Sequence, residues 1–217
     1  MRNIVRNALV VAIASTPAIG GVALLAQQGG SSKPATYITK EEVDAVNKTP
    51  GVDRTIRVMD IGHENFAVGI IHRGSTRNPA PAGAGGGGGT AAAAEPCGMK
   101  GDPAPAGTPS GIAHDSQTEG YLIVSGAGEM VTGGHIHNGR KSAPNAEVTT
   151  TLNGPSCSGA MMGNDVSKRQ VKVGDIIIIP AGTPHGWSDI PDHVDYLSFR
   201  PSQRVLTAGY VNPAIKK

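Results

Sequence analysis

The chain has 217 residues, a formal net charge of +2 and an aromatic content of 3%. A chain of this length can bury the core of one domain, and with so few aromatic residues that core must consist of Val, Ile, Leu and Ala, which favours strands. Arg2 and Arg6 account for the excess positive charge, and both lie in a leader. The remaining chain is neutral overall and has no basic cluster, which argues against a nucleic-acid partner.

Residues 1–26 have the pattern of a secretory signal peptide. The two arginines precede an apolar run at residues 8–14, and small residues continue to Ala26. Pro17 interrupts the run, so fewer uniformly apolar residues remain than the roughly 20 that a membrane-spanning helix needs. We therefore expect cleavage at Ala23 or Ala26, no stable membrane association afterwards, and a periplasmic or secreted protein.

Export makes the two cysteines, Cys97 and Cys157, informative. Disulfides persist outside the reducing cytosol, and closing a loop of about 60 residues would stabilise the fold by about 4 kcal/mol in the chain-entropy model. Two unbonded buried thiols are the alternative. A metal role is disfavoured because neither cysteine has a second ligand at short spacing. We expect a disulfide.

Residues 27–36 are predicted to form a flexible tether, and residues 37–217 a single domain. A short N-terminal helix is expected from Thr39, which can cap it in a capping box with Glu42. Alternating apolar segments bounded by Gly and Pro predict short strands, at residues 54–60, 66–73, 121–124, 129–132, 147–152, 170–173, 176–179 and 194–199. Many short strands with almost no helix indicate an all-β sandwich or barrel.

An insertion is predicted at about residues 78–110. It contains five consecutive glycines and four consecutive alanines, a composition from which no packed element is expected. A segment of this length inside a compact domain is typical of a mobile spacer or of a lid over a site.

The most specific motif spans residues 174–189, Gly-Asp-Ile-Ile-Ile-Ile-Pro-Ala-Gly-Thr-Pro-His-Gly-Trp-Ser-Asp. We interpret it as a buried strand of four isoleucines that ends at Pro180, followed by a turn that presents His185. The segment resembles the second cupin motif, Gly-x5-Pro-x-Gly-x2-His-x3-Asn, with Asp189 in place of the final Asn.

A second segment resembles the first cupin motif from that motif's second histidine onward. His114 is followed after four residues by Glu119 and after six more by Gly126, whereas Ile112 stands where the family has its first histidine. Period-two alternation places Glu119 and Tyr121 on one strand face, which is consistent with a carboxylate inside a barrel. The resemblance implies an antiparallel cupin barrel, the double-stranded β-helix or jelly roll.

The resemblance also implies one divalent transition metal held by His114, Glu119 and His185. Two imidazoles and one carboxylate leave positions open for exchangeable ligands, which a catalytic metal requires. This ligand count is typical of a non-haem iron site, so Fe(II) is favoured, although Mn(II), Zn(II) and Ni(II) fit the same ligands.

Other histidines are candidates for the pocket or for a fourth ligand. His72 shares a strand face with Val68 and Ile70, so it is a candidate to point into the barrel, with a solvated rim position as the alternative. We interpret His135 and His137 as the tip of a hairpin over the pocket mouth, because no Glu follows them at the spacing of the family motif.

Three aromatic residues are further candidates. Tyr121 would be the natural proton donor if it lies in the pocket, although its ordinary pKa near 10 would need tuning. Trp187 and Tyr196 alternate with apolar neighbours on late strands and fit either the core or the pocket wall.

Three classes of function remain open, each with a small-molecule partner and compatible with a homodimer. The favoured one is a non-haem iron dioxygenase that cleaves a carbon–carbon bond. The second is a non-redox lyase or isomerase, in which the metal acts as a Lewis acid on a carbonyl or hydroxyl. The third is a non-catalytic cupin that binds a small ligand or a sugar.

Overall fold

The computed structural model describes residues 34–77, 95–202 and 205–215. The chain divides into two compact units, Met1–Pro34 and Ala35–Lys217, and nearly all of the described residues belong to the second. The predicted signal peptide and most of the predicted tether lie outside the described residues. Among the helices that the structure does describe, none is long and apolar enough to cross a membrane.

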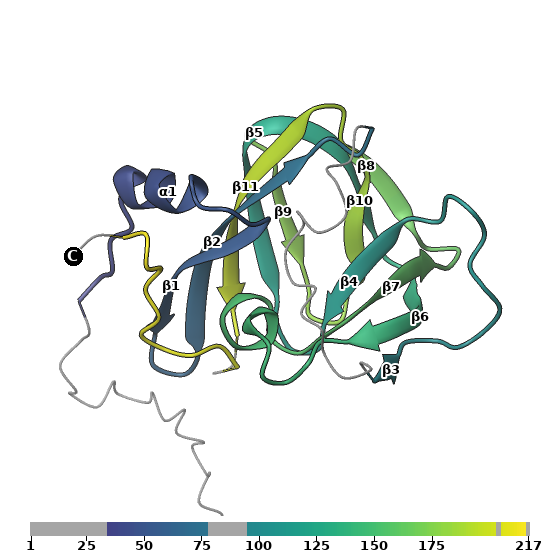
Figure 1. Cartoon of the computed structure of the whole chain (residues 1–217), viewed down its shortest axis with the longest axis horizontal. Helices are drawn as coiled ribbons and strands as arrows, with labels where there is room; N and C mark the ends of the chain where they lie inside the picture. The colour runs from purple at the N-terminus through teal and green to yellow at the C-terminus, as the bar shows by residue number, and fades with distance from the viewer. Residues whose placement is uncertain (1–33, 78–94, 203–204, 216–217) are drawn as a thin grey trace, which may run out of the picture. The chain divides into compact units, whose positions relative to one another are not determined.

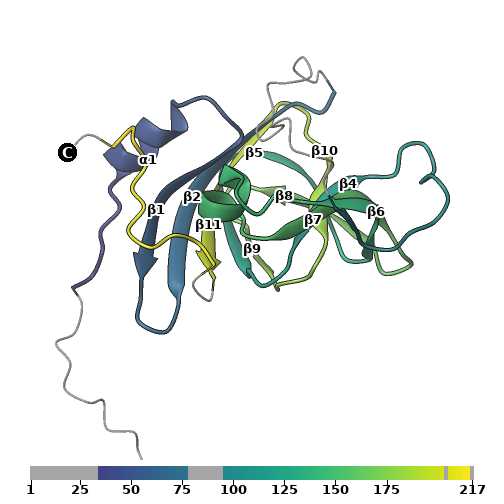
Figure 2. The ribbon, with the colours of Figure 1, turned by 60° about the horizontal axis from the view of Figure 1, so that its bottom comes forward.

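The domain is an antiparallel β-structure, as predicted (Figure 1). Its strands are β1 (Asp53–Asp60), β2 (Asn65–Gly74), β3 (Pro96–Cys97), β4 (Ser110–His114), β5 (Glu119–Thr132), β6 (His135–Lys141), β7 (Ser156–Met162), β8 (Ser167–Lys172), β9 (Ile176–Ile179), β10 (His185–Asp189) and β11 (His193–Pro201). Within the described residues they follow the order β1-β2-β11-β5-β10-β4-β7-β6-β3, with β8 and β9 also paired to β5. Turning the molecule separates the group around β1, β2 and β11 from the group around β4, β6 and β7 (Figure 2).

The long strand β5 belongs to both groups. Its first half pairs with β11 and β9, and its second half pairs with β10 and β8. Gly126 lies near the change of partners with φ +68°, and a Cβ there would meet the backbone of His193, so glycine lets the strand bend at this point. The segments predicted as separate strands at 121–124 and 129–132 are therefore two parts of one bent strand.

The predicted helix is confirmed as α1 (Lys40–Asn47). The Thr39 side chain accepts a hydrogen bond from the Glu42 amide, and the Glu42 carboxylate accepts one from the Thr39 amide. Val46 is buried against Ile56 of β1 and Ile70 of β2. The helix therefore covers one face of these two strands.

The largest buried cluster lies inside the barrel and is mainly aliphatic, as the composition predicts. Its members come from both strand groups: Ile71, Tyr121, Ile123, Met130, Val171, Ile179, Ile190, Val194 and Tyr196. Because β2 contributes Ile71 to this cluster and Ile70 to the cluster under α1, this strand is buried on both faces.

Two expectations about local structure are wrong. Residues 147–152 do not form a strand, because Val148–Leu152 is a short π-helix, η1. The side chains of its threonines donate to nearby backbone carbonyls, at Ala143, Ala146 and Glu147. Such local hydrogen bonds compete with strand pairing and outweigh the β-propensity of threonine.

The strand of four isoleucines is also not buried throughout. Ile176 is 70% exposed and Ile178 is 67% exposed, whereas Ile179 is buried. The residues of β9 therefore alternate between solvent and the barrel interior, as in a strand with one buried face.

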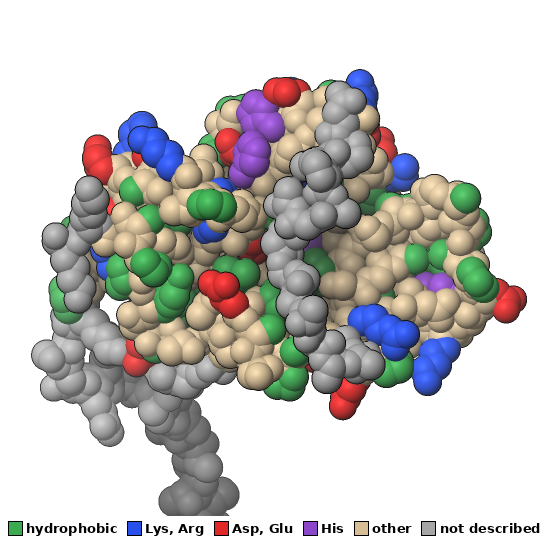
Figure 3. Space-filling view, viewed as in Figure 1, with side chains coloured by type: hydrophobic (Ala, Val, Ile, Leu, Met, Phe, Trp, Pro, Cys, Tyr) green, Lys and Arg blue, Asp and Glu red, His purple; other side chains and the backbone are tan. Residues whose placement is uncertain are grey.

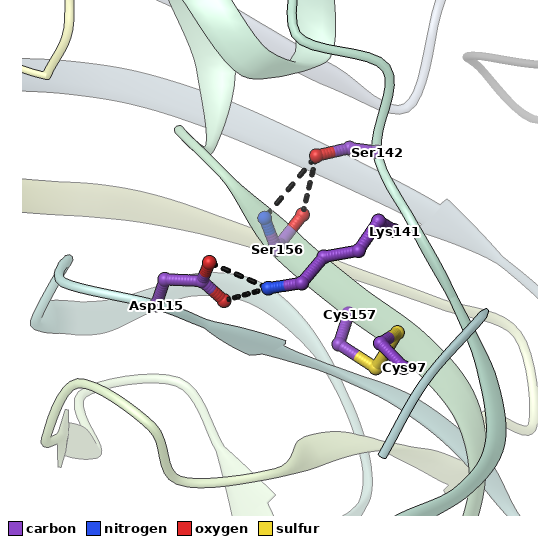
Figure 4. The surroundings of a disulfide bond; sticks show 6 residues. All are labelled: Cys97, Asp115, Lys141, Ser142, Ser156 and Cys157. Carbon is purple, nitrogen blue, oxygen red and sulfur yellow. Dashed lines mark hydrogen bonds and ion pairs between the residues drawn. A yellow bond between two sulfur atoms is a disulfide. The ribbon is translucent and has the colours of Figure 1, made fainter. Parts of the chain in front are cut away.

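The predicted insertion is only partly covered by the structure, because residues 78–94 lie outside the described residues. The expectation that the segment forms no packed element is wrong for its later part. There, β3 pairs with β6, and the predicted disulfide between Cys97 and Cys157 is confirmed. Figure 4 shows this disulfide near an ion pair between Asp115 and Lys141.

Candidate metal centre

The three predicted ligands come together inside the barrel. His114 ends β4, Glu119 begins β5 and His185 begins β10. All are buried, and their ligand atoms lie within 4.8 Å of one another. Oε2 of Glu119 is 3.1 Å from Nε2 of His114 and 3.0 Å from Nε2 of His185.

These separations and the donor set fit a metal ion. With metal–ligand bonds of about 2.1 Å, ligand atoms at right angles around an ion are about 3.0 Å apart. Nδ1 of His185 lies 3.0 Å from the Thr183 carbonyl oxygen, which can only accept a hydrogen bond. Nδ1 therefore carries the proton, and Nε2 presents its lone pair to the site. The three side chains could hold one metal ion.

Two glycines bring the histidine-bearing strands together. Gly111 of β4 faces Gly186 of β10, and a Cβ on Gly111 would lie 2.4 Å from the His185 carbonyl oxygen. A Cβ on Gly186 would lie 2.4 Å from the carbonyl oxygen of Ser110. Because neither glycine has a Cβ, the strands approach closely, and the rings of His114 and His185 lie 5.2 Å apart between centroids.

No protein-family model matches the chain, and no curated protein matches it. Among solved structures, a Bacillus halodurans protein is 14% identical, with 82% of this chain and 89% of that chain covered and a TM-score of 0.39. A Klebsiella pneumoniae protein with a double-stranded β-helix domain is 14% identical, with coverages of 80% and 94% and a TM-score of 0.33. Oxalate oxidase in complex with glycolate is 12% identical, with coverages of 83% and 65% and a TM-score of 0.33. Similarities this weak carry no argument alone, so the assignment depends on the topology and the motifs.

The two motifs lie on strands that bring their metal-ligating side chains together inside the barrel. The first runs from the end of β4 into β5, the second runs from β9 through a turn into β10, and their ligands meet at one buried point. This chain has the cupin fold. Within the cupin barrel, Ile112 takes the place of the family's first histidine and contributes to the wall beside the site.

An arginine that the sequence analysis missed holds the carboxylate of the site. Nε of Arg200 on β11 donates to Oε1 of Glu119 at 2.6 Å, and its NH2 group donates to Oδ2 of Asp53 at 2.5 Å. Burial raises the pKa of Glu119, but the charge of Arg200 and the contacts with both histidines outweigh this and hold the pKa well below its ordinary value. Glu119 is therefore an anion. Arg200 fixes its orientation through Oε1, and Oε2 faces the histidines and could bind a metal.

Tyr121 lies in the site, as the strand pattern predicts. Its hydroxyl donates to Oε2 of Glu119 at 2.5 Å, and its ring packs 4.4 Å from that of Tyr196. Burial, together with the negative charge of Glu119, raises the pKa of Tyr121 well above its ordinary value. Tyr121 thus stays protonated, and its hydroxyl can act as a hydrogen-bond donor.

The site lies at the base of a cleft. A small cavity of about 30 Å³ is bounded by all three ligands, and a larger cleft of about 690 Å³ shares part of its wall. The shared residues are Arg73, Ile112, Asn153, His185, Gly186 and Trp187. The larger volume lies in the range of small-molecule pockets. Of the two places left open for Trp187, core or pocket wall, the structure shows features of both, because the residue packs against the core cluster and lines both cavities.

Of the two places considered for His72, the structure shows the solvated rim of the cleft and not the barrel interior. His72 shares its strand face with Val68 and Ile70, which pack in the cluster under α1. Its own ring is 47% exposed at the outer cleft and lies 2.5 Å from Asp195. The barrel-facing residues of β2 are on the other face, where Arg73 borders the metal site. The strand pattern left both places open because both faces of β2 are apolar.

His135 and His137 lie on β6 and not at the tip of a hairpin. His137 is buried, and its Nε2 lies 2.7 Å from the carbonyl oxygen of Asp102. Within the described part of the chain, neither joins the metal-ligand group or lines the cavity beside it. No candidate fourth histidine reaches the site there.

Proposed function

We propose that this cupin is a metal-dependent oxygenase, a non-haem iron dioxygenase acting on a small organic substrate. The observation that carries the proposal is the buried set of His114, Glu119 and His185 at the base of a cleft. Two imidazoles and one carboxylate with open positions are the ligand set of non-haem Fe(II) oxygenases. A bound metal would supply Lewis acidity and, as iron, electron exchange with dioxygen.

The protein's own side chains would orient that chemistry. Arg200 fixes the carboxylate of Glu119, and the Thr183 carbonyl fixes the tautomer of His185. Ile112 and Trp187 are apolar side chains in the wall that the cleft and the small cavity share. Apolar walls limit water near the metal and strengthen the electrostatic interactions there.

The test is an oxygen-uptake screen on protein purified without a histidine tag. Separate samples are loaded with Fe(II), Mn(II), Zn(II) or Ni(II) under nitrogen and then mixed with small phenols, thiols and carboxylates in aerated buffer. We expect substrate-dependent oxygen uptake with Fe(II) only, and none with Fe(II) and His185→Ala. Turnover that is equally fast with Zn(II) and without oxygen would contradict the oxygenase proposal.

One observation favours the second candidate, a non-redox lyase or isomerase. The buried Tyr121 hydroxyl is a hydrogen-bond donor beside the candidate metal position, where it can donate to an oxygen that becomes negative in the reaction. This candidate predicts oxygen-independent turnover that falls strongly in Tyr121→Phe. Ligand binding without turnover under any of these conditions would instead indicate a non-catalytic binding cupin.

We propose further that the protein is exported. The Cys97–Cys157 disulfide supports an oxidising compartment, since such bonds are rare in the cytosol. Intact-mass measurement of protein recovered from the periplasm or medium should give a chain that starts after Ala23 or Ala26. A mature chain that still begins at Met1 would contradict export by a cleaved leader.

A further inference from the structure

Two arginines border the candidate metal site, the buried Arg200 and the partly buried Arg73, and they differ in what they bind. Arg200 has a protein acceptor for each of its nitrogens: Glu119, Asp53 and the Leu152 carbonyl. Arg73 makes one hydrogen bond, from Nε to the Tyr196 hydroxyl at 3.0 Å. Within the described residues its two terminal nitrogens have no protein acceptor, although the residue borders both the metal-site cavity and the cleft.

Arg73 makes no ion pair with a carboxylate in the described residues, although the charge of Asp53 acts on it from nearby. Asp53 and Glu119 are the acidic residues of the small cavity, and both are bonded to Arg200. The larger cleft has no Asp or Glu in its described lining. An arginine is charged at every accessible pH. The two carboxylates of the small cavity equal its two arginines in number, so a divalent metal there would give an excess of positive charge next to the cleft. The cleft therefore favours an anion.

We propose that Arg73 binds the carboxylate of a small organic acid, so that the substrates of this site are small carboxylates. The planar guanidinium matches a carboxylate with two parallel hydrogen bonds, which a point charge does not. Nε is held by Tyr196, so the terminal nitrogens remain for the ligand. Ile112 and Trp187, which border both cavities, would contact the apolar part of the acid. This inference depends on the proposed function only in naming the bound acid as a substrate.

Trp187 provides a direct readout, because it is the only tryptophan of the chain and lines both cavities. Its fluorescence is followed while benzoate or its uncharged analogue benzamide is added, to metal-free and to Zn(II)-loaded protein. We expect benzoate to bind at least about 10-fold more tightly than benzamide, since a charge-assisted bidentate pair is lost in the amide. Equal affinities of the two probes would overturn the proposal without any variant.

The variants then locate the effect. Arg73→Gln should bind benzoate at least about 10-fold more weakly and leave benzamide binding unchanged, and Arg73→Lys should bind benzoate with intermediate affinity. The matched control is Arg77→Gln, since Arg77 is paired with Asp189 outside the cleft and should not affect benzoate. Full benzoate affinity in folded Arg73→Gln would overturn the proposal, as would phosphate competing as well as benzoate.

The same titrations separate this inference from the proposed function. Arg73-dependent benzoate binding in metal-free protein would support the inference even if no metal bound or no turnover occurred. A protein that binds metal and consumes oxygen, but whose ligands do not depend on Arg73, would retain the proposed function and lose the inference.

Discussion

The candidate metal site joins two sides of the barrel that position their side chains by different means. The carboxylate of Glu119 is held by side chains, through the ion pairs of Arg200 with Glu119 and Asp53. The histidines come from β4 and β10, where the backbone sets their positions. His185 has a single carbonyl partner, and Nδ1 of His114 is buried without any described partner. The carboxylate side thus depends on charge, and the histidine side depends on strand packing.

A disulfide supports the histidine side through β7, the strand that pairs with β4. Cys157 of β7 is paired with Ala113, the residue before His114. Its disulfide to Cys97 ties β7 to β3, and Lys141 bonds to Asp115 just after His114 (Figure 4). On the space-filling surface, charged side chains are scattered over the described residues, with no large patch of one sign on this face (Figure 3). Because ion pairs hold Glu119, loss of a charge should destabilise the carboxylate side most. Because a disulfide and strand packing support the histidines, loss of a covalent or steric constraint should destabilise the histidine side most.

The largest effect is expected from Arg200→Met. This change leaves the buried Glu119 and the partly buried Asp53 without the guanidinium that bonds to both, and such losses cost about 3–5 kcal/mol of unfolding free energy. Urea denaturation of metal-free protein measures the loss. Zn(II) should stabilise this variant more than the wild type, because the metal supplies positive charge beside Glu119.

The matched control for Arg200→Met is Arg57→Met, which breaks the partly exposed pair between Arg57 and Glu42. Such pairs contribute about 1 kcal/mol or less. If both variants lost equally little stability, the carboxylate side would not depend on charge.

Replacing both Cys97 and Cys157 by Ala should have the next largest effect. Removing the crosslink frees a loop with a sequence separation of 60 residues and is expected to cost about 2–4 kcal/mol. The ratio of bound Zn(II) to protein at saturation should stay unchanged, because the ligands remain. An unchanged unfolding free energy under matched oxidising conditions would show that the disulfide does not constrain the histidine side.

Gly186→Ala tests the strand packing itself. The added Cβ would lie 2.4 Å from the Ser110 carbonyl oxygen, so β4 and β10 must separate, at a cost of about 1–3 kcal/mol. Zn(II) affinity should fall because the two histidines move apart. Gly74→Ala is the control, since a Cβ there meets nothing within 4 Å. Equal Zn(II) affinity in both variants would contradict the role assigned to this contact.

The smallest effect concerns pH and the pair between Arg57 and Glu42. The hydrogen bond from Arg57 holds the pKa of Glu42 below its ordinary value of 4.5, against the effect of burial. A carboxylate with a lowered pKa stabilises the fold above its unfolded pKa, and this stabilisation is lost as the pH falls through the folded value. Glu42→Gln should therefore be slightly less stable than the wild type at pH 7 and equally stable well below pH 4.5. A difference that persists at low pH would exclude this ionic origin.

The sequence predicted the fold where side-chain patterns are strong and failed where they are weak. The capping box of α1 and the alternating residues of β5 were found because their signals are local. The strands β4 and β7 were missed because they are rich in Ser, Gly and Ala, and pairing with their neighbours forms them despite low propensity. The threonines of η1 had the opposite effect, because their high strand propensity predicted a strand where the structure has a helix.

The sequence predicted the three candidate metal ligands of the site but not the arginines that surround them. His114, Glu119 and His185 were found because motif spacing defines them. Arg200 and Arg73 were missed because their roles depend on which strand face lies inside the barrel. For Arg200 a signal existed, since it follows Tyr196 and Ser198 on the buried face of β11. For Arg73 the sequence held no such signal, because both faces of β2 are apolar and the pattern does not show which one lies inside the barrel.

The most direct test of the account is the metal content of protein purified without a tag, saturated with Zn(II) and dialysed. The wild type and His63→Ala, which changes an exposed histidine, should each retain about one equivalent, and His185→Ala should retain almost none. A full equivalent on folded His185→Ala would contradict the claim that His114, Glu119 and His185 together hold the metal.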